Sequence, residues 1–358
     1  MLNSFQTSGN SPGARCRVGI LGFGTVGAAV ARRLTGPDSI PSLELTHICD
    51  RRAREKRARQ SQPIERLSWT DHFDDLLASD VDVIVEVVGG GEPAVDYVRG
   101  ALLAGKSVVT ANKQVLAHQG PALLGLAERQ GRQLRFEAAV GGAMPIVRAL
   151  GDGLAGEQVT RIEAILNGTT NAVLSSMDTS GCSIDEAVAD ACARGYAEAN
   201  PSDDLEGLDA AAKLSILCML AFRLRVLPAQ IDLRTSARVR PEDFREAGLR
   251  GGTIRQIAHA EFDRARSALI AWVAPTFVPR GSLFARATGP ENAAIISGTF
   301  AGTITLTGAG AGGDATAVAA IGDLLAIARD RAAIVPAPAL TEPATIKGLS
   351  DHSLAEAV

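Results

Sequence analysis

Hydrophobic and polar residues follow one another along this chain in a pattern that predicts strands, glycine turns and helices in alternation. The first apolar run, residues 18–21, leads into a glycine turn and then a helical Ala/Val/Leu pattern. Residues 81–88 and 107–110 are apolar throughout, as in central parallel strands with both faces covered. A second glycine turn, residues 308–313, precedes a predicted helix over 315–328. The pattern therefore predicts an α/β protein with a doubly wound parallel sheet.

The glycine turn after the first strand has the spacing of a dinucleotide-binding fingerprint. Its first glycine makes a tight turn, its second lets the backbone approach a pyrophosphate, and its third lets the helix pack on the strand. The flanking strand and helix favour this interpretation over a chance glycine turn. We therefore predict a Rossmann dinucleotide-binding domain whose cofactor contacts include Gly22, Phe23, Gly24, Thr25, Val26 and Gly27.

The predicted second strand ends in Asp50, about where such a domain keeps the acid that binds a ribose. Arg51 follows directly, and an arginine there can hold a 2′-phosphate. The residues therefore leave NAD and NADP both open. We expect most of residues 51–59 to form a solvated helix face.

Later strand ends also carry polar or small residues. Ligands gather at the carboxyl ends of strands in a doubly wound sheet, so we expect Gly89, Thr110, Asn112 and Lys113 to line the cofactor crevice. Lys113 could equally begin a helix and point to solvent.

The pattern changes near Pro145, which predicts that a second domain begins there. We place the dinucleotide domain at residues 15–144 with a returning helix at 314–330, the second domain at 145–313, and a short tail at 331–358.

Within these limits the sequence predicts further elements. A strand over 134–145 closes the first half, and a helix over 148–154 opens the second. An amphipathic helix is expected over 253–260, and strands are expected over 268–278, 282–289 and 300–308.

Residues 195–213 bring five acids and one lysine to the start of an apolar helix. Asp203 and Glu206 stand three apart, the spacing of a capping box, so we expect the helix to begin near Asp204. Asp209 and Lys213 stand four apart and should share one helical face. The charges are compatible with an ordinary helix start, or with a lysine that protonates a bound carbonyl.

Composition limits the class of protein. The 358 residues suffice for two domains, and a net charge of −4 without an extended basic patch gives little support for nucleic-acid or membrane partners. We find no apolar run of bilayer length. Five cysteines without a C-x-x-C pair indicate a reduced, cytoplasmic compartment, and the scattered histidines give no support for a zinc site.

Seven motifs in order resemble those of homoserine dehydrogenases, from about Arg17 to Asp330. They read GFGTVG, VDVIVEVVGG, VVTANK, FEAAVGGAMP, ILNGTTN, GYAEANPSDDLEGLDAAAKL and GAGAGGDATA. The resemblance implies reversible NAD(P)-dependent interconversion of L-homoserine and L-aspartate 4-semialdehyde by hydride transfer, with a lysine as proton donor or acceptor. A typical member is a homodimer with a Rossmann dinucleotide-binding domain and a mixed α+β domain for substrate binding and dimerisation, so the resemblance implies this role for residues 145–313.

The resemblance also implies roles for individual residues. The substrate-binding acids correspond to Glu198, Asp204 and Asp209, and the two candidate catalytic lysines, which the sequence does not rank, to Lys213 and Lys113. Gly195 corresponds to a cofactor-site glycine. Family members hold a monovalent cation, Na⁺ or K⁺, through backbone carbonyls that would here belong to Glu137, Val140, Gly142 and Met144.

Two further contacts follow from the residues themselves. Thr169, in the polar turn Asn167–Asn171, could cap a helix or clasp the substrate carboxylate. Gly312, in the second glycine turn, could contact the cofactor.

Two other functions stay open from the residues alone: another amino-acid dehydrogenase, such as an aspartate dehydrogenase, or a non-catalytic NAD(P)-sensing protein. An intact set of Glu198, Asp209 and Lys213 argues against a sensor. Asn200 stands where the family usually has an acid. Many members carry a C-terminal regulatory domain or an N-terminal aspartate kinase, and neither is recognisable here. We therefore expect a monofunctional enzyme that L-threonine does not inhibit.

Overall fold

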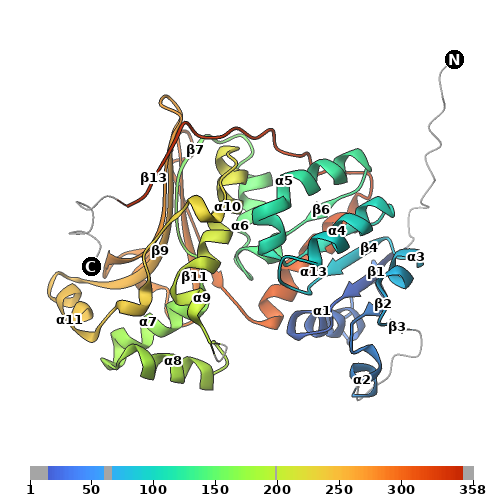
Figure 1. Ribbon diagram of the computed structural model, residues 1–358, viewed down its shortest axis with the longest axis horizontal. Coiled ribbons are helices and arrows are strands. Elements are labelled where there is room, and N and C mark those ends of the chain that lie inside the picture. The colour runs from blue at the N-terminus through green and yellow to red at the C-terminus, as the bar shows by residue number, and fades with distance from the viewer. Residues whose placement is uncertain (1–14, 60–66, 198–199, 350–358) are drawn as a thin grey trace.

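The computed structural model describes residues 15–59, 67–197 and 200–349. It contains two β-sheets, each with its own helices, joined by α10 and α5, which pack against each other (Figure 1).

The first sheet has six parallel strands in the order β3-β2-β1-β4-β5-β6. Their bounds are Cys16–Leu21 for β1, Leu43–Cys49 for β2, Ser68–Thr70 for β3, Val83–Glu86 for β4, Ser107–Thr110 for β5 and Leu134–Arg135 for β6. This order is that of a dinucleotide-binding sheet, in which ligands lie at the carboxyl ends where the winding reverses, between β1 and β4. The predicted parallel sheet, with β4 at its centre, is confirmed.

Six helices cover this sheet. They are α1 (Thr25–Thr35), α2 (Ala53–Ala58), α3 (Phe73–Ala78), α4 (Ala94–Leu103), α5 (Lys113–Arg129) and the returning α13 (Gly313–Arg329). Val30 and Leu34 of α1 share an apolar cluster with Ala320 and Leu324 of α13. The last long helix therefore returns to the first sheet, as the sequence predicts, and lies beside α1 (Figure 1).

The second sheet is mixed, in the order β12-β11-β7-β9-β10-β13, with β8 paired to β10. Its strands are β7 (Val159–Ile165), β8 (Asp232–Leu233), β9 (Gly252–Asp263), β10 (Ala268–Pro279), β11 (Glu291–Gly298), β12 (Thr303–Ala309) and β13 (Thr345–Lys347). Thus β13, from the predicted tail, joins this sheet in parallel with β10.

Helices line both faces of the second sheet. The main ones are α7 (Gly168–Ser180), α8 (Ile184–Ala193), α9 (Ser202–Leu205), α10 (Leu208–Phe222), α11 (Pro241–Leu249) and α12 (Leu283–Arg286). Ala258 and Ala260 of β9 pack with α10, whereas Ile257 faces α12 on the other side. Short 3₁₀ helices are η1 (Glu137–Ala139), η3 (Pro228–Gln230) and η4 (Ser236–Arg238).

Two predictions in the second half are wrong. The expected helix over 253–260 is strand β9, in which residues 252–260 are all buried. A strand covered on both faces loses the alternation that distinguishes it from a helix. The expected strand over 282–289 begins instead as α12, because the Ser282 side chain accepts a hydrogen bond from the backbone N–H of Ala285.

Predictions around the domain junction are only partly right. The expected strand over 134–145 stops after β6 and continues as η1. The expected helix over 148–154 is α6 (Ile146–Arg148) followed by a π-helical turn, Ala149–Gly153.

The predicted capping box at Asp203 and Glu206 is wrong. Gly207 has a left-handed φ of 83° and separates α9 from α10, whose first residue is Leu208. Glu206 instead accepts a hydrogen bond from the Thr235 hydroxyl at 3.0 Å. A left-handed residue breaks the helix that the spacing assumes.

One apolar cluster joins the two sheets through α10. It contains Leu116 of α5, Leu214 and Ile216 of α10, and Ile162 of β7. The start of α10 is therefore held rigidly where the two sheets meet. Within the described ranges, we find no helix with the length and hydrophobicity that a bilayer crossing requires.

Candidate active site

A pocket of about 420 Å³ opens beside the start of α10. It brings together five residues that the sequence predicts for the site: Lys113, Thr169, Gly195, Asp204 and Asp209. They come from the starts of α5 and α7, the segment after α8, and helices α9 and α10. Further polar residues of its wall are Gln114, Tyr196, Asn200 and Asp203.

Asp209 is the centre of the charge network in this pocket. Its Oδ1 lies 2.7 Å from Lys113 Nζ, and its Oδ2 lies 2.8 Å from Lys213 Nζ. The predicted pairing of Asp209 with Lys213 on one helical face is confirmed. Burial alone would raise the pKa of Asp209, but the two lysines outweigh it and hold that pKa far below its ordinary value. The carboxylate is therefore ionised at neutral pH.

The two lysines differ in their access to the pocket. The Lys113 side chain is 36% exposed and lines the pocket, so the alternative that it points to solvent does not hold. The Lys213 side chain is 12% exposed and also donates a hydrogen bond to the carbonyl of Leu166 at 2.8 Å. Burial would lower the pKa of Lys113, but Asp209 raises it more, so this ammonium stays charged.

Asn167 connects two of the acids, and the sequence analysis did not single it out. Its Nδ2 donates to Asp204 Oδ1 at 2.6 Å and to Asp209 Oδ2 at 2.8 Å. Burial raises the pKa of Asp204, the hydrogen bond from Asn167 opposes that change, and the charge of Asp209 adds to it. The polar turn was the available signal, but the long-range partners of its first residue could not be read from it.

Thr169 and Gly195 form a second edge of the pocket. The Thr169 hydroxyl donates to the carbonyl of Tyr196 at 2.8 Å, which anchors the segment after α8. Gly195 has a φ of 75°, a conformation that favours glycine. Glu198, the remaining predicted substrate acid, lies outside the described residues.

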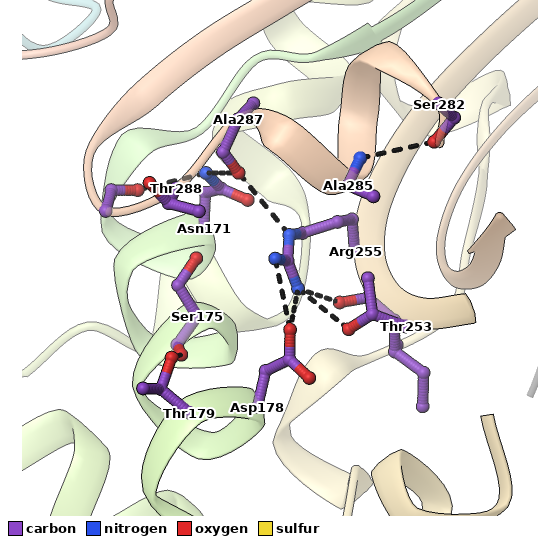
Figure 2. Close-up of polar contacts among 12 residues, drawn as sticks. Asn171, Ser175, Asp178, Thr179, Thr253, Arg255, Ser282, Ala285, Ala287 and Thr288 are labelled. Atoms are coloured by element: carbon purple, nitrogen blue, oxygen red, sulfur yellow. Dashed lines mark hydrogen bonds and ion pairs between the residues drawn. The ribbon is translucent and has the colours of Figure 1, made fainter. Parts of the chain in front are cut away.

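Asn171, the last residue of the polar turn, contacts a neighbouring loop and does not line the pocket. Figure 2 shows Asn171 pointing at the loop after α12, where its Nδ2 lies 3.1 Å from the carbonyl oxygen of Ala287. The same carbonyl accepts from the buried Arg255, whose guanidinium also pairs with Asp178 at 3.3 Å (Figure 2). These contacts fix that loop against α7.

The first glycine turn has the geometry that its fingerprint requires. Gly22 has a φ of 97°, and a Cβ on Gly27 would lie 2.1 Å from the carbonyl oxygen of Gly22. A Cβ on Gly24 would meet nothing within 4 Å, so the backbone there is open to a ligand. Helix α1 has no side-chain cap, which leaves the N–H groups of its first turn available for an anion. Thr25 is exposed and Val26 half-buried at this helix start, and Phe23 is buried.

Asp50 closes that turn from the end of β2. Its Oδ2 accepts from the backbone N–H of Phe23 at 2.7 Å and from Lys56 Nζ at 2.6 Å. Burial would raise the pKa of Asp50, but the hydrogen bonds from Lys56 and from the backbone hold it below its ordinary value. Arg51 is exposed in the following turn.

The residues at the ends of β4 and β5 shape the next loop. Thr110 is fully buried, and its hydroxyl donates to Glu86 at 2.5 Å. The side-chain oxygen of Asn112 caps α5, while its Nδ2 donates to the carbonyl of Gly90 at 2.8 Å. Thr110 and Asn112 therefore hold the loop that carries the exposed Gly89, which has a φ of 80°. Burial raises the pKa of Glu86, an acid that the sequence analysis missed because it lies in an apolar run.

The second glycine turn lies against the first. A Cβ on Gly313 would come within 2.9 Å of the Thr25 side chain, and Gly312 has a φ of 112° with open space beside it. Gly312 is thus brought to the same edge as Gly24, although residues 25–311 separate them in the chain.

The four carbonyls expected to hold a cation belong to one turn of the chain. Gly142 has a φ of 63°, and its backbone lies against those of Ala309 and Gly310. The carbonyl of Met144 accepts from the N–H of Ile146 at 2.8 Å, and that of Glu137 accepts from Val140 at 3.4 Å. Each keeps a lone pair for an ion.

Comparison with protein families adds independent support to this geometry. A profile described as homoserine dehydrogenase matches residues 145–325, and one described as the homoserine dehydrogenase NAD-binding domain matches residues 22–137.

Individual relatives are also similar over most of the chain. Homoserine dehydrogenase from Mycobacterium tuberculosis is 42% identical over 324 residues, which covers 88% of this chain and 72% of that protein. The enzyme from Corynebacterium glutamicum is 37% identical over 337 residues, or 90% and 74% of the two chains.

Solved structures show the same fold. A homoserine dehydrogenase from Thiobacillus denitrificans superposes with a TM-score of 0.85 at 31% identity, covering 93% of this chain and 80% of that one. A hyperthermophilic archaeal homoserine dehydrogenase in complex with NADPH gives a TM-score of 0.73 at 26% identity, covering 88% and 98%. These similarities favour this family over the other dehydrogenase and the sensor that the sequence left open.

Proposed function

Since the chain belongs to the homoserine dehydrogenase family, which interconverts L-homoserine and L-aspartate 4-semialdehyde with NAD(P), we propose that the reaction takes place in the pocket beside α10. One observation carries this assignment. The Asp209 carboxylate pairs with Lys113 at the start of α5, beside the first sheet, and with Lys213 of α10, which packs on the second sheet. A charged network thus lies between the cofactor edge and the substrate wall.

The acids of the pocket bind the substrate ammonium. Asp204 and Asp209 line the pocket, and Glu198 follows Tyr196 and Ala197 of its wall by sequence. The Thr169 hydroxyl already donates to Tyr196 and the N–H of Thr170 to Asn167, so the backbone N–H groups of Gly168 and Thr169 at the start of α7 are the donors that suit the substrate carboxylate. Opposite charges at the two ends of an amino acid fix its direction in the pocket.

The lysines act on the oxygen that changes charge. The bound cofactor supplies the hydride, and the aldehyde oxygen then develops negative charge that a nearby cation stabilises. Lys113 and Lys213 share Asp209, so we propose that they work as one proton-donating unit. In the opposite direction the same unit, after one lysine has given its proton to solvent, receives the proton of the alcohol.

The cofactor lies along the carboxyl edge of the first sheet. The open backbone at Gly24 and the uncapped start of α1 suit a pyrophosphate, and Gly89 and Gly312 border the same edge. Asp50 suits a ribose hydroxyl, whereas Arg51 suits a 2′-phosphate, so both NAD and NADP remain candidates.

Four further proposals follow from the family resemblance. The turn Glu137–Met144 would hold Na⁺ or K⁺ through carbonyl oxygens, which these hard cations prefer. A homodimer would form through the second sheet, where Ile270 is 37% exposed on the face opposite α10. The domains would have the limits 15–144 with 314–330, and 145–313. The cytoplasm would be the compartment.

Formation of NADH and of NADPH from L-homoserine, each followed by absorbance with one oxidised cofactor, tests the function and the cofactor preference together. We expect turnover with at least one cofactor and none with L-aspartate as substrate. Turnover of L-aspartate alone would identify an aspartate dehydrogenase. Cofactor binding without turnover of either amino acid would identify a sensor.

A further inference from the structure

The amide of Asn167 is fully engaged inside the protein. The residue is 5% exposed, and its Nδ2 donates to Asp204 Oδ1 at 2.6 Å and to Asp209 Oδ2 at 2.8 Å. Its Oδ1 accepts from the backbone N–H of Thr170 at 2.7 Å, which caps α7. Because both amide hydrogens and the oxygen have partners, this side chain has no donor left for a substrate.

We propose that Asn167 is a positioning residue that holds Asp204 and Asp209 at a fixed separation and in their working charge states. The inference rests on the proposed function of the pocket, since it assigns Asp204 and Asp209 to the substrate.

Only a neutral side chain with two donors fits between these acids. Two nearby carboxylates repel each other, and each favours protonation of the other. A primary amide directs one hydrogen to each acid without adding a charge. A hydroxyl offers a single donor, and a carboxylate offers none.

The segment before α7 fixes the lysine as well as the acids. Lys213 donates to the carbonyl of Leu166, the residue next to Asn167. Two consecutive residues at the end of β7 therefore hold groups from α9 and α10 that lie far along the chain. Leu166 and Asn167, which follow β7, thus fix the positions of the charged side chains that are proposed to bind the substrate.

The charges that face Asp204 give the sign of a pH effect. Burial and the charge of Asp209 favour its protonated form, whereas Asn167, Lys213 and Lys113 favour its ionised form. Removal of the Asn167 donor raises the pKa of Asp204 further. Homoserine binding, which needs the ionised acid, then fails at a higher pH than in the wild type.

Two substitutions separate the bridge from the helix cap. Asn167→Ser keeps a good capping oxygen but is too short to reach both acids. Asn167→Asp keeps the shape and the capping oxygen but replaces both donors by an acceptor. We expect kcat/KM for L-homoserine to fall about ten-fold or more in Asn167→Ser, mainly through KM, and further in Asn167→Asp. The KM for the cofactor should change less than about two-fold, because hydrogen bonds of Asn167 end on the substrate acids.

The matched control is Ser183→Ala, which removes the capping side chain of α8 without touching an acid of the pocket. It should lower the melting temperature about as much as any lost cap but leave both KM values and the pH profile unchanged.

The decisive measurement is the pH dependence of kcat/KM for L-homoserine in the wild type, both Asn167 variants and the control. The inference is supported if the acid side of the pH profile of Asn167→Ser lies at higher pH than that of the wild type. If the serine variant does not fold, the inference is supported by a homoserine KM that is higher in folded Asn167→Asp than in the wild type. A uniform loss at every pH with an unchanged homoserine KM means that Asn167 only caps α7, which overturns the inference. Failure of the wild type itself to oxidise L-homoserine overturns the proposed function and this inference with it.

Discussion

Each of the two domains holds an aspartate paired with a lysine, but the two aspartates are held in opposite ways. Asp50, which follows β2 and is half-buried, takes its described partners from one stretch of the first domain, residues 23–56: Lys56 and the backbone N–H groups of Phe23 and Arg52. Asp209, on α10, is held by side chains alone, and two of them, Lys113 and Asn167, come from distant segments. The first arrangement forms with one local unit, whereas the second forms only when both sheets have come together.

The charge balance of the two regions differs as well. Asp50 meets one lysine, so the pair is neutral, and its hydrogen bond from Phe23 supports the glycine turn. Asp209 meets two lysines, so two cations lie beside this acid. A cation placed next to the aldehyde oxygen stabilises that oxygen as it becomes negative. The comparison therefore assigns loop support to the first region and chemistry to the second.

The largest expected effect comes from Asp209→Asn. Removing one member of a buried, hydrogen-bonded charge network costs about 3–5 kcal/mol, so kcat/KM should fall roughly a hundred- to five-thousand-fold. Asp263→Asn, which breaks an exposed pair with Arg266 instead, is the matched control and should behave as the wild type. Steady-state kinetics with L-homoserine measures both. Near-normal activity of Asp209→Asn would remove the distinction between the two regions.

Lys113→Met and Lys213→Met, alone and combined, test whether the lysines act as a unit. Loss of a positioned proton donor costs about a hundred-fold or more, so each single variant should lose that much in kcat. The double variant should be little worse than either single one, because groups that act together are not additive. A double variant whose loss equals the product of the single losses would show two independent lysines.

Asp50→Asn should affect the cofactor and spare the amino acid. The substitution loses the ion pair with Lys56 and weakens the closure of the glycine turn at Phe23, so we expect KM for the cofactor to rise about ten-fold. The KM for L-homoserine should stay within about two-fold of the wild-type value, since Asp50 lies in the cofactor region and not in the pocket beside α10. Lys56→Met, which leaves both backbone hydrogen bonds of Asp50 intact, should give a smaller rise.

The smallest effect concerns stability in acid. The folded-state pKa values of Asp50 and Asp209 lie below the ordinary value, so each contributes stability that is present above that value. That stability is lost as pH falls from about 4 through the folded-state values. Denaturant unfolding of the wild type should therefore weaken below pH 4, and Asp50→Asn should show a shallower decline. If the free energy of unfolding falls equally steeply with pH in the two proteins, the partners of Asp50 do not lower its pKa.

The parts of the fold that were predictable are those that depend on local sequence. The glycine turn at Gly22–Gly27 and the helix start after it follow from the glycine spacing. The strands beside it follow from their short apolar runs. The pair Asp209–Lys213 was predictable for the same reason, since it lies within one turn of helix. The returning helix α13 could be recognised from the glycine turn before it.

The parts that failed depend on contacts between distant segments. Strand β9 looked helical because its two faces meet different helices, which removes the alternation of a half-exposed strand. The capping box failed at Gly207, whose left-handed conformation ends α9 before α10 begins and whose missing Cβ would come within 3.1 Å of Val273 on β10. The polar turn that contains Asn167 could be recognised, but the partners of Asn167 on α9 and α10 are placed by the whole second sheet. The Thr110 hydroxyl donates to Glu86 of the neighbouring strand, a contact that the sequence did not reveal, and its predicted place in the cofactor crevice stays a prediction.

The ion pair between Lys113 and Asp209 has a consequence for engineering. Exchange of the dinucleotide half for that of another reductase, in order to change cofactor choice, would also exchange the residue at position 113. Asp209 would then lose half of its counter-charge even though no residue of the substrate half had been altered. A chimera of this kind has to carry a cation at the start of its grafted α5, so cofactor specificity and turnover cannot be redesigned as separate modules in this protein.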